Sequence, residues 1–183
     1  MTSGIALLLN GSMADLSATV HAIALAKRTA SVVHAVFVET DGRGQNAGGE
    51  GDRPDGLETE GRAAQFIALA CWLGDVEQVR VHVHTLESWA DELLVRFCST
   101  YRIFCLVLGA RDREAIVRKA AWFERFRRRI AGERDWFLPL PWSVIIAPWE
   151  KPVFEQMLNR LKQGAWSTAA IKRLAGSLQP GLL

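Results

Sequence analysis

Short apolar runs alternate along this chain with longer stretches in which apolar side chains follow a helical spacing. Apolar runs of this length are typical of buried strands in a parallel sheet. Strands are expected at 5–9, 31–39, 79–85, 103–108 and 144–147, and helices at 13–28, 57–73, 88–101 and 113–131. This order predicts a doubly wound, Rossmann-like α/β domain, in which a five-stranded parallel sheet carries helices on both faces.

Two segments depart from the alternation. Residues 40–56 are rich in Gly, Asp and Asn and almost without apolar side chains, which predicts a flexible loop within the domain. Beyond Pro148 the alternation stops, and residues 151–164 and 165–176 have the spacing of two short amphipathic helices. We therefore expect one α/β domain over 1–149 and a C-terminal helical tail over 150–183.

Composition narrows the class of protein. The 183 residues are 49% hydrophobic, enough for a real core, and the net charge of +2 is too small to drive nonspecific binding to nucleic acid. No apolar run approaches the ~20 residues that span a bilayer, and the N-terminus has no pattern of a secretory signal. The three cysteines lie in apolar segments without zinc or redox spacing, which indicates reduced thiols and a cytoplasmic protein.

Two turns are the expected place for any ligand, because open α/β sheets bind ligands beyond the carboxyl ends of their strands. Asn10-Gly11-Ser12 follows the first strand, and Gly109-Ala110-Arg111-Asp112 follows the fourth. Ser12 and Asp15 have the spacing of a capping box at the start of a helix. Both turns lack residues that would identify the ligand, and no Gly-Lys-Ser/Thr follows the Gly-rich stretch 40–56, so a phosphate-binding loop is not supported there.

Over roughly residues 4–149 the sequence resembles the universal stress protein family. Asn10-Gly11-Ser12 stands where that family has an Asp-x-Ser-like turn, Val36-Phe37-Val38-Glu39 ends the second strand, and Gly109–Asp112 resembles Gly-Ser-Arg-Gly. Pro141–Ile146 is a loose match to the family's fifth strand. The resemblance implies strand order 3-2-1-4-5, a stress-response role, and a homodimer formed through the last strand, here Trp142–Trp149.

ATP-binding members of that family carry Gly-x2-Gly-x9-Gly-Ser/Thr after the fourth strand, and this chain departs from it. Only Gly109 is present; Asp112 takes the place of the second glycine, and Trp122 and Phe123 take the place of the Gly-Ser pair. We expect these rings to fill the crevice beside Gly109, so that no cofactor binds in the ordinary ATP mode. The alternative is a nucleotide-binding regulator with an altered pocket for ATP or AMP, framed by Asn10, Gly11, Ser12, Phe37, Gly109 and Arg111.

Catalytic and metal-binding patterns are not evident. No Ser-His-Asp order with a nucleophile elbow occurs, so we expect no enzyme activity. His82 and His84 share one face of a strand, but no further metal ligand lies near them in the sequence. His34 stands alone in its strand, where a core or flank role suffices.

The remaining candidates are surfaces. In the helix over 113–131, Arg118, Arg125 and Arg129 line one border of an apolar face formed by Trp122, Phe123, Phe126 and Ile130. They form either a site for an acidic partner or a solvated flank paired with glutamates. The basic, apolar tail packs on its own domain or a second copy, binds another protein, or lies on an anionic membrane, and we favour the first. These features together favour a cytoplasmic, non-catalytic regulator or adaptor that acts by association.

Overall fold

The computed structural model of the chain describes residues 3–38, 56–86, 91–133 and 142–163. Ten elements follow in the predicted order: β1 (Gly4–Leu9), α1 (Ala14–Thr29), β2 (Val32–Val38), α2 (Gly56–Glu77), β3 (Val81–Leu86), α3 (Asp91–Thr100), β4 (Ile103–Ala110), α4 (Arg113–Glu133), β5 (Ser143–Pro148) and α5 (Lys151–Gln163). The loop predicted over 40–56, except its last residue, and the second tail helix predicted over 165–176 lie outside the described residues.

The five strands form one parallel sheet in the order β3-β2-β1-β4-β5, which confirms the expected topology. The chain winds outward from β1 to β3 on one side and then crosses over to β4 on the other. The order therefore reverses at β1, and the carboxyl ends of β1 and β4 border the switch point at which such sheets bind ligands.

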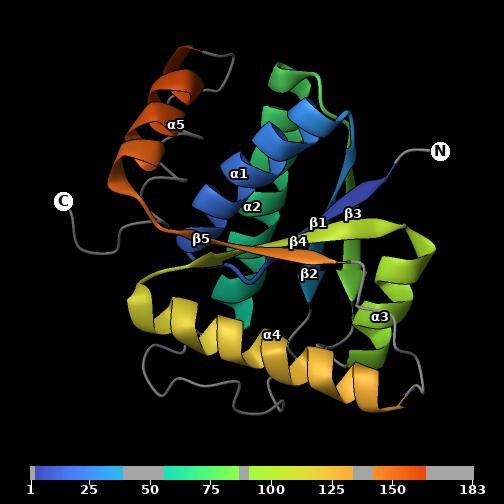
Figure 1. Cartoon of the computed structure of the whole chain (residues 1–183). Helices are drawn as coiled ribbons and strands as arrows, with labels where there is room; N and C mark the ends of the chain where they lie inside the picture. The colour runs from blue at the N-terminus through green and yellow to red at the C-terminus, as the bar shows by residue number, and fades with distance from the viewer. Residues whose placement is uncertain (1–2, 39–55, 87–90, 134–141, 164–183) are drawn as a thin grey trace.

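Helices cover both faces of the sheet (Figure 1). On one face α1, α2 and α5 enclose a core that contains Ile5, Leu7 and Leu9 of β1 together with Phe66 of α2. On the other face α3 and α4 enclose a second core, which contains Ala6 and Leu8 of β1. Because side chains alternate across a strand, β1 supplies both cores and all six of its residues are buried.

The first tail helix belongs to the body of the molecule. Met157 of α5 is only 3% exposed and lies in the core on the α1 side of the sheet. Arg160 also binds the Glu77 carboxylate at the end of α2 at 2.7 Å, and Lys27 of α1 binds the same carboxylate at 2.7 Å. Packing and charge thus join α5 to α1 and α2.

Helix α2 continues past Gly74 and Asp75, where the sequence predicted its end. The left-handed residue after the helix is Gln78, with φ of 58°. Gly74 instead allows α2 to pack closely against Val81 of β3, because a Cβ at Gly74 would lie 2.4 Å from Val81 Cγ2. A glycine that permits close contact and a glycine that ends a helix look alike in sequence.

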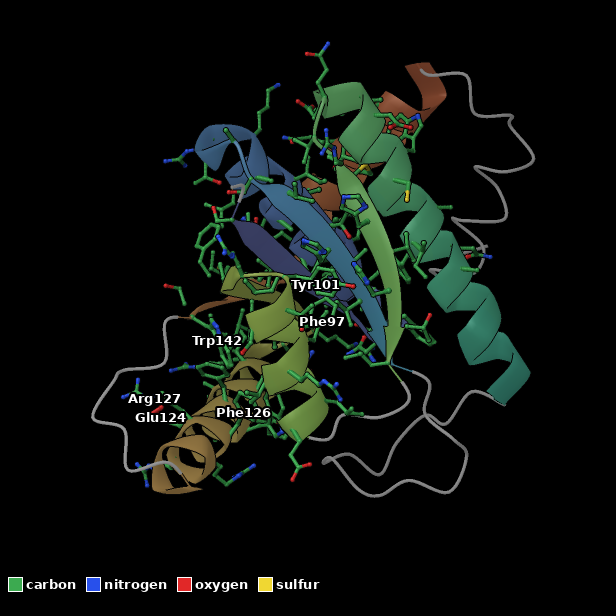
Figure 2. The ribbon with its side chains drawn as sticks, turned by 90° about the vertical axis from the view of Figure 1, so that its right-hand side faces the viewer. Phe97, Tyr101, Glu124, Phe126, Arg127 and Trp142 are labelled. Atoms are coloured by element: carbon green, nitrogen blue, oxygen red, sulfur yellow. The ribbon has the colours of Figure 1, made fainter. Side chains whose placement is uncertain are left out.

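Trp122 and Phe123 pack between α4 and the sheet. Trp122 stacks on Phe126 with ring centroids 5.5 Å apart, and Phe126, which is buried, stacks on Trp142 at 6.3 Å (Figure 2). The rings therefore fill the α4 side of the core, as the helical spacing predicted. The residue that a Cβ at Gly109 would meet is Ala14 of α1, and not Trp122 or Phe123.

Candidate functional site

The turn after β1 closes on a carboxylate of the chain itself. The Asp15 carboxylate oxygen Oδ2 accepts the backbone N–H groups of Asn10 at 2.8 Å, Gly11 at 2.8 Å and Ser12 at 3.1 Å. Gly11 adopts φ of 78°, a left-handed conformation that glycine reaches without strain. Successive N–H groups in such a turn form a concave site for an anion, and here Asp15 occupies it.

Only half of the predicted capping box forms at the start of α1. The Asp15 carboxylate accepts the Ser12 N–H, as in a capping box. The Ser12 hydroxyl, however, donates to Asp15 Oδ1 at 3.3 Å, and the Asp15 N–H donates to the Ser12 carbonyl at 2.9 Å. The Ser12–Asp15 spacing thus places the buried Asp15 carboxylate beneath the turn.

Gly109 of β4 allows α1 to approach the sheet closely at the same edge. A Cβ at Gly109 would lie 2.2 Å from the carbonyl oxygen of Ala14. Gly109 shares the α1 face of the strand with Cys105 and Val107, since side chains alternate along β4. The first turn of α1 therefore takes the place beside Gly109 that the sequence analysis assigned to Trp122 and Phe123.

Lys119 of α4 brings a positive charge to this edge. Its ammonium group donates to the Gly109 carbonyl and attracts the Asp15 carboxylate electrostatically. Burial raises the pKa of Asp15 to about 6, although the N–H groups of the turn and the Lys119 charge act in the opposite direction. Burial also lowers the pKa of Lys119, so desolvation dominates for both partners.

The other predicted site residues lie at the same edge of the sheet. Phe37, at the end of β2, is buried and pairs in register with Leu9. Arg111 follows β4 and is exposed. Topology thus brings all six predicted residues to the carboxyl ends of β1, β2 and β4.

Asp112 caps the helix that follows it. Its Oδ1 accepts the Ala115 N–H at 2.7 Å, and its carbonyl accepts the Ile116 N–H at 3.0 Å. The carboxylate that replaces the second glycine of the ATP motif therefore stabilises the start of α4. It adds a second negative group at this edge.

Two central residues of this edge were not among the predicted site residues. Asp15 was interpreted only as a capping residue, because its spacing from Ser12 gives no information on burial. The sequence around Lys119 does not indicate its role, because Lys119 is one of several basic residues of α4. Its contact with Gly109 joins residues ten positions apart in the sequence.

The arginine surface of α4 is partly paired with glutamates. Arg118 lies 3.5 Å from Glu114, and both side chains are exposed. Arg127 lies 3.9 Å from Glu124, also with exposed side chains (Figure 2). Arg125 is exposed, and the side chain of Arg129 lies outside the described residues. The contacts of Arg118 fit the solvated flank that the sequence analysis weighed against a site for an acidic partner.

Across the residues placed by the structure, no group of three or more His, Cys, Asp or Glu is arranged to hold a metal ion. Within the same residues, every helix is too short or too polar to cross a membrane.

No protein-family model and no curated protein matches this sequence. Solved structures do match. A universal stress protein family member from Burkholderia pseudomallei superposes with a TM-score of 0.51 at 18% identity, covering 80% of this chain and 96% of that one. A universal stress protein from Archaeoglobus fulgidus superposes with a TM-score of 0.50 at 15% identity, covering 80% and 94%. At this identity the likeness establishes the universal stress protein fold.

Proposed function

We propose that this protein is a cytoplasmic, non-catalytic regulator of the universal stress type, which acts by association and does not bind ATP in the ordinary mode. One observation carries the proposal: the Asp15 carboxylate occupies the anion site formed by the N–H groups of Asn10, Gly11 and Ser12. A phosphate group gains most from N–H groups that have no other acceptor. A triphosphate at this edge would have to displace Asp15 or lie against it, and Asp112 adds further repulsion.

Calorimetry tests the loss of the ATP site. Titration of magnesium-ATP into the purified chain at pH 7.5 is expected to give no saturable heat below about 1 mM, a threshold that corresponds to roughly 4 kcal/mol of binding free energy. Saturable binding with a micromolar Kd would overturn the proposal.

Association through β5 is the second part of the proposal. β5 is the outermost strand of the sheet, beyond β4, and Val144, Ile145 and Ile146 are only half-buried there. The outer edge of such a strand offers unpaired backbone groups, which favour pairing with another strand. This supports the homodimer that the family resemblance implies.

Sedimentation velocity tests the homodimer. The proposal predicts a particle of twice the 20.3 kDa chain mass at micromolar concentration. A species of 20.3 kDa that persists to about 1 mM, where even weak specific dimers with a Kd in that range form, would refute it.

A second candidate is a nucleotide-binding regulator with an altered pocket. One observation favours it: Phe37, Arg111 and Lys119 lie at the same edge of the sheet. There the positive charges of Arg111 and Lys119 would offset the negative charge of Asp15. If any nucleotide binds, Arg111→Ala should weaken it roughly tenfold, as expected for loss of a charged hydrogen bond. Arg113→Ala is the matched control, because Arg113 is also exposed nearby. Equal affinity in the two variants would exclude this candidate.

A further inference from the structure

Three of the four histidines meet at the opposite, amino edge of the sheet. His34 of β2 pairs in register with His82 of β3, and His84 lies two residues further along β3 on the same face. His34 Nδ1 and His84 Nε2 lie 2.9 Å apart and share a hydrogen bond, and the His34 and His82 ring centroids are 5.6 Å apart. In the sequence His34 stands alone, because the pairing of β2 with β3 is not visible there.

Neighbouring elements hold these rings in place. Tyr101, which follows α3, lies 4.8 Å from His34 and 4.6 Å from His84, measured between ring centroids, and Phe97 packs edge-on against His84 at 5.0 Å (Figure 2). Gly4 of β1 leaves space for His34, since a Cβ there would lie 2.9 Å from His34 Cδ2. The cluster is therefore fixed by β1, β2, β3 and α3.

A cavity of about 330 Å³ opens beside the cluster. Its volume lies at the lower end of the range for sites that bind small molecules. The lining combines two guanidinium groups, two imidazoles, two hydroxyls and an aliphatic side chain. It consists of Val32, His34, Arg80, His82, Thr100, Tyr101 and Arg102. Among the residues that the structure describes, the lining contains no carboxylate, and the exposed Arg80 gives it a positive charge.

Arg80, and not the histidines, supplies that charge near neutral pH. Burial, followed by the neighbouring His84 and His82, lowers the pKa of His34 to about 4, and burial also lowers the pKa of His84. The His34–His84 pair is therefore neutral at pH 7, and one ring donates to the other. A guanidinium binds carboxylate and phosphate groups in a planar, two-pronged geometry.

We infer that this cavity binds a small aromatic anion. Arg80 holds its carboxylate or phosphate group, and its ring packs against Tyr101 and the imidazoles. The inference goes beyond the proposed function, because the cavity lies at the amino edge of β2 and β3, away from the Asn10–Ser12 turn. A purely structural role for Arg80, as a cation beside Thr100 at the C-terminal end of α3, is the competing explanation.

Histidine ring signals in the NMR spectrum of the whole chain test the inference. Phenyl phosphate is the probe, benzyl alcohol is the uncharged control, and His21, exposed on α1, is the internal reference. We expect phenyl phosphate to shift the His34 and His82 signals saturably and to raise the pKa of His34, because a nearby anion favours the protonated form. Benzyl alcohol should leave all four rings unchanged, and His21 should not respond to either compound.

Arg80→Gln makes the test specific. The Arg80 side chain is exposed, and its backbone carbonyl, which accepts the Val33 N–H, is kept, so the variant should fold. We expect its affinity for phenyl phosphate to fall roughly tenfold, whereas Arg113→Gln should retain the parent affinity. No saturable shift, an equal response from His21, or equal weakening in the two variants would each overturn the inference.

Discussion

Asp15 is subject to two opposing effects in the folded protein. Its carboxylate is fully buried, which disfavours the charged form, yet it accepts three backbone N–H groups that favour the charged form. The pKa near 6 shows that burial outweighs the hydrogen bonds and Lys119. The turn after β1 is thus ordered by a group that changes charge just below neutral pH.

The sign of the resulting pH dependence follows from linkage. The pKa of Asp15 is about 6 in the folded chain against 3.8 for the free side chain, so the folded state binds more protons between these values. Stability from this group is greatest below pH 4 and is lost as pH rises through 6. The wild type should therefore gain up to ~3 kcal/mol relative to Asp15→Asn when pH falls from 7 to 4.

Urea unfolding of both proteins across this range measures that difference. His34, whose lowered pKa acts with the opposite sign over the same range, is present in both proteins and cancels. Asp75→Asn, which changes an exposed aspartate, is the control and should show no such trend. A difference that stays constant from pH 4 to 7 would mean that Asp15 is not buried as described.

The residues of the candidate site that could be predicted are those that come directly after a strand in the sequence. Asn10 and Gly109 end apolar runs, so a parallel sheet must bring them to one edge. The charged pair that defines this edge was not predictable in this way. Asp15 lies inside a common capping pattern, and Lys119 depends on how α4 lies across β4, which is a tertiary property.

At the scale of elements, the backbone of α1 lies close to β4 at the candidate site. Gly109→Ala would place a methyl group against the Ala14 backbone, which must shift to admit it. We expect a loss of about 1–3 kcal/mol in the free energy of unfolding, the usual cost of overpacking. Thermal and urea unfolding measure it, and an unchanged stability would show that α1 does not press on β4 at this point.

Helix α5 provides a test of how far the folded unit extends. Met157→Ala should cost about 2–4 kcal/mol if α5 packs on α1 as observed, because it removes a buried side chain from the core. Gln156→Ala changes an exposed neighbour on the same helix and should cost less than about 0.5 kcal/mol. Equal stability of the two variants in urea would mean that α5 does not contribute to the domain.

Elements were more predictable than their ends and contacts. Apolar runs of strand length and helical spacing are local properties, and they located all ten elements in order. The end of α2 was misplaced because Gly74 serves a contact with Val81, which lies beyond the helix. The histidine cluster was missed for the same reason, since it depends on the register between β2 and β3.

At the scale of the whole molecule, the two edges of one sheet differ in charge. The carboxyl edge, where this fold has its switch point, is closed by Asp15 and the first turn of α1. The amino edge carries a positively charged cavity beside His34 and His82. Binding of an anion at the amino edge, as inferred above, would mean that the shared fold does not determine which edge binds a ligand.

The central claim is that the chain's own carboxylate occupies the anion site of the β1–α1 turn. The most direct measurement follows the backbone N–H signals of Asn10, Gly11 and Ser12 by NMR, first through a pH titration and then with added magnesium-ATP. We predict that the three signals move together with a midpoint near pH 6, the pKa of Asp15, and that ATP leaves them unchanged at pH 7.5. Signals that ignore pH in this range, or that shift saturably with ATP, would contradict the account.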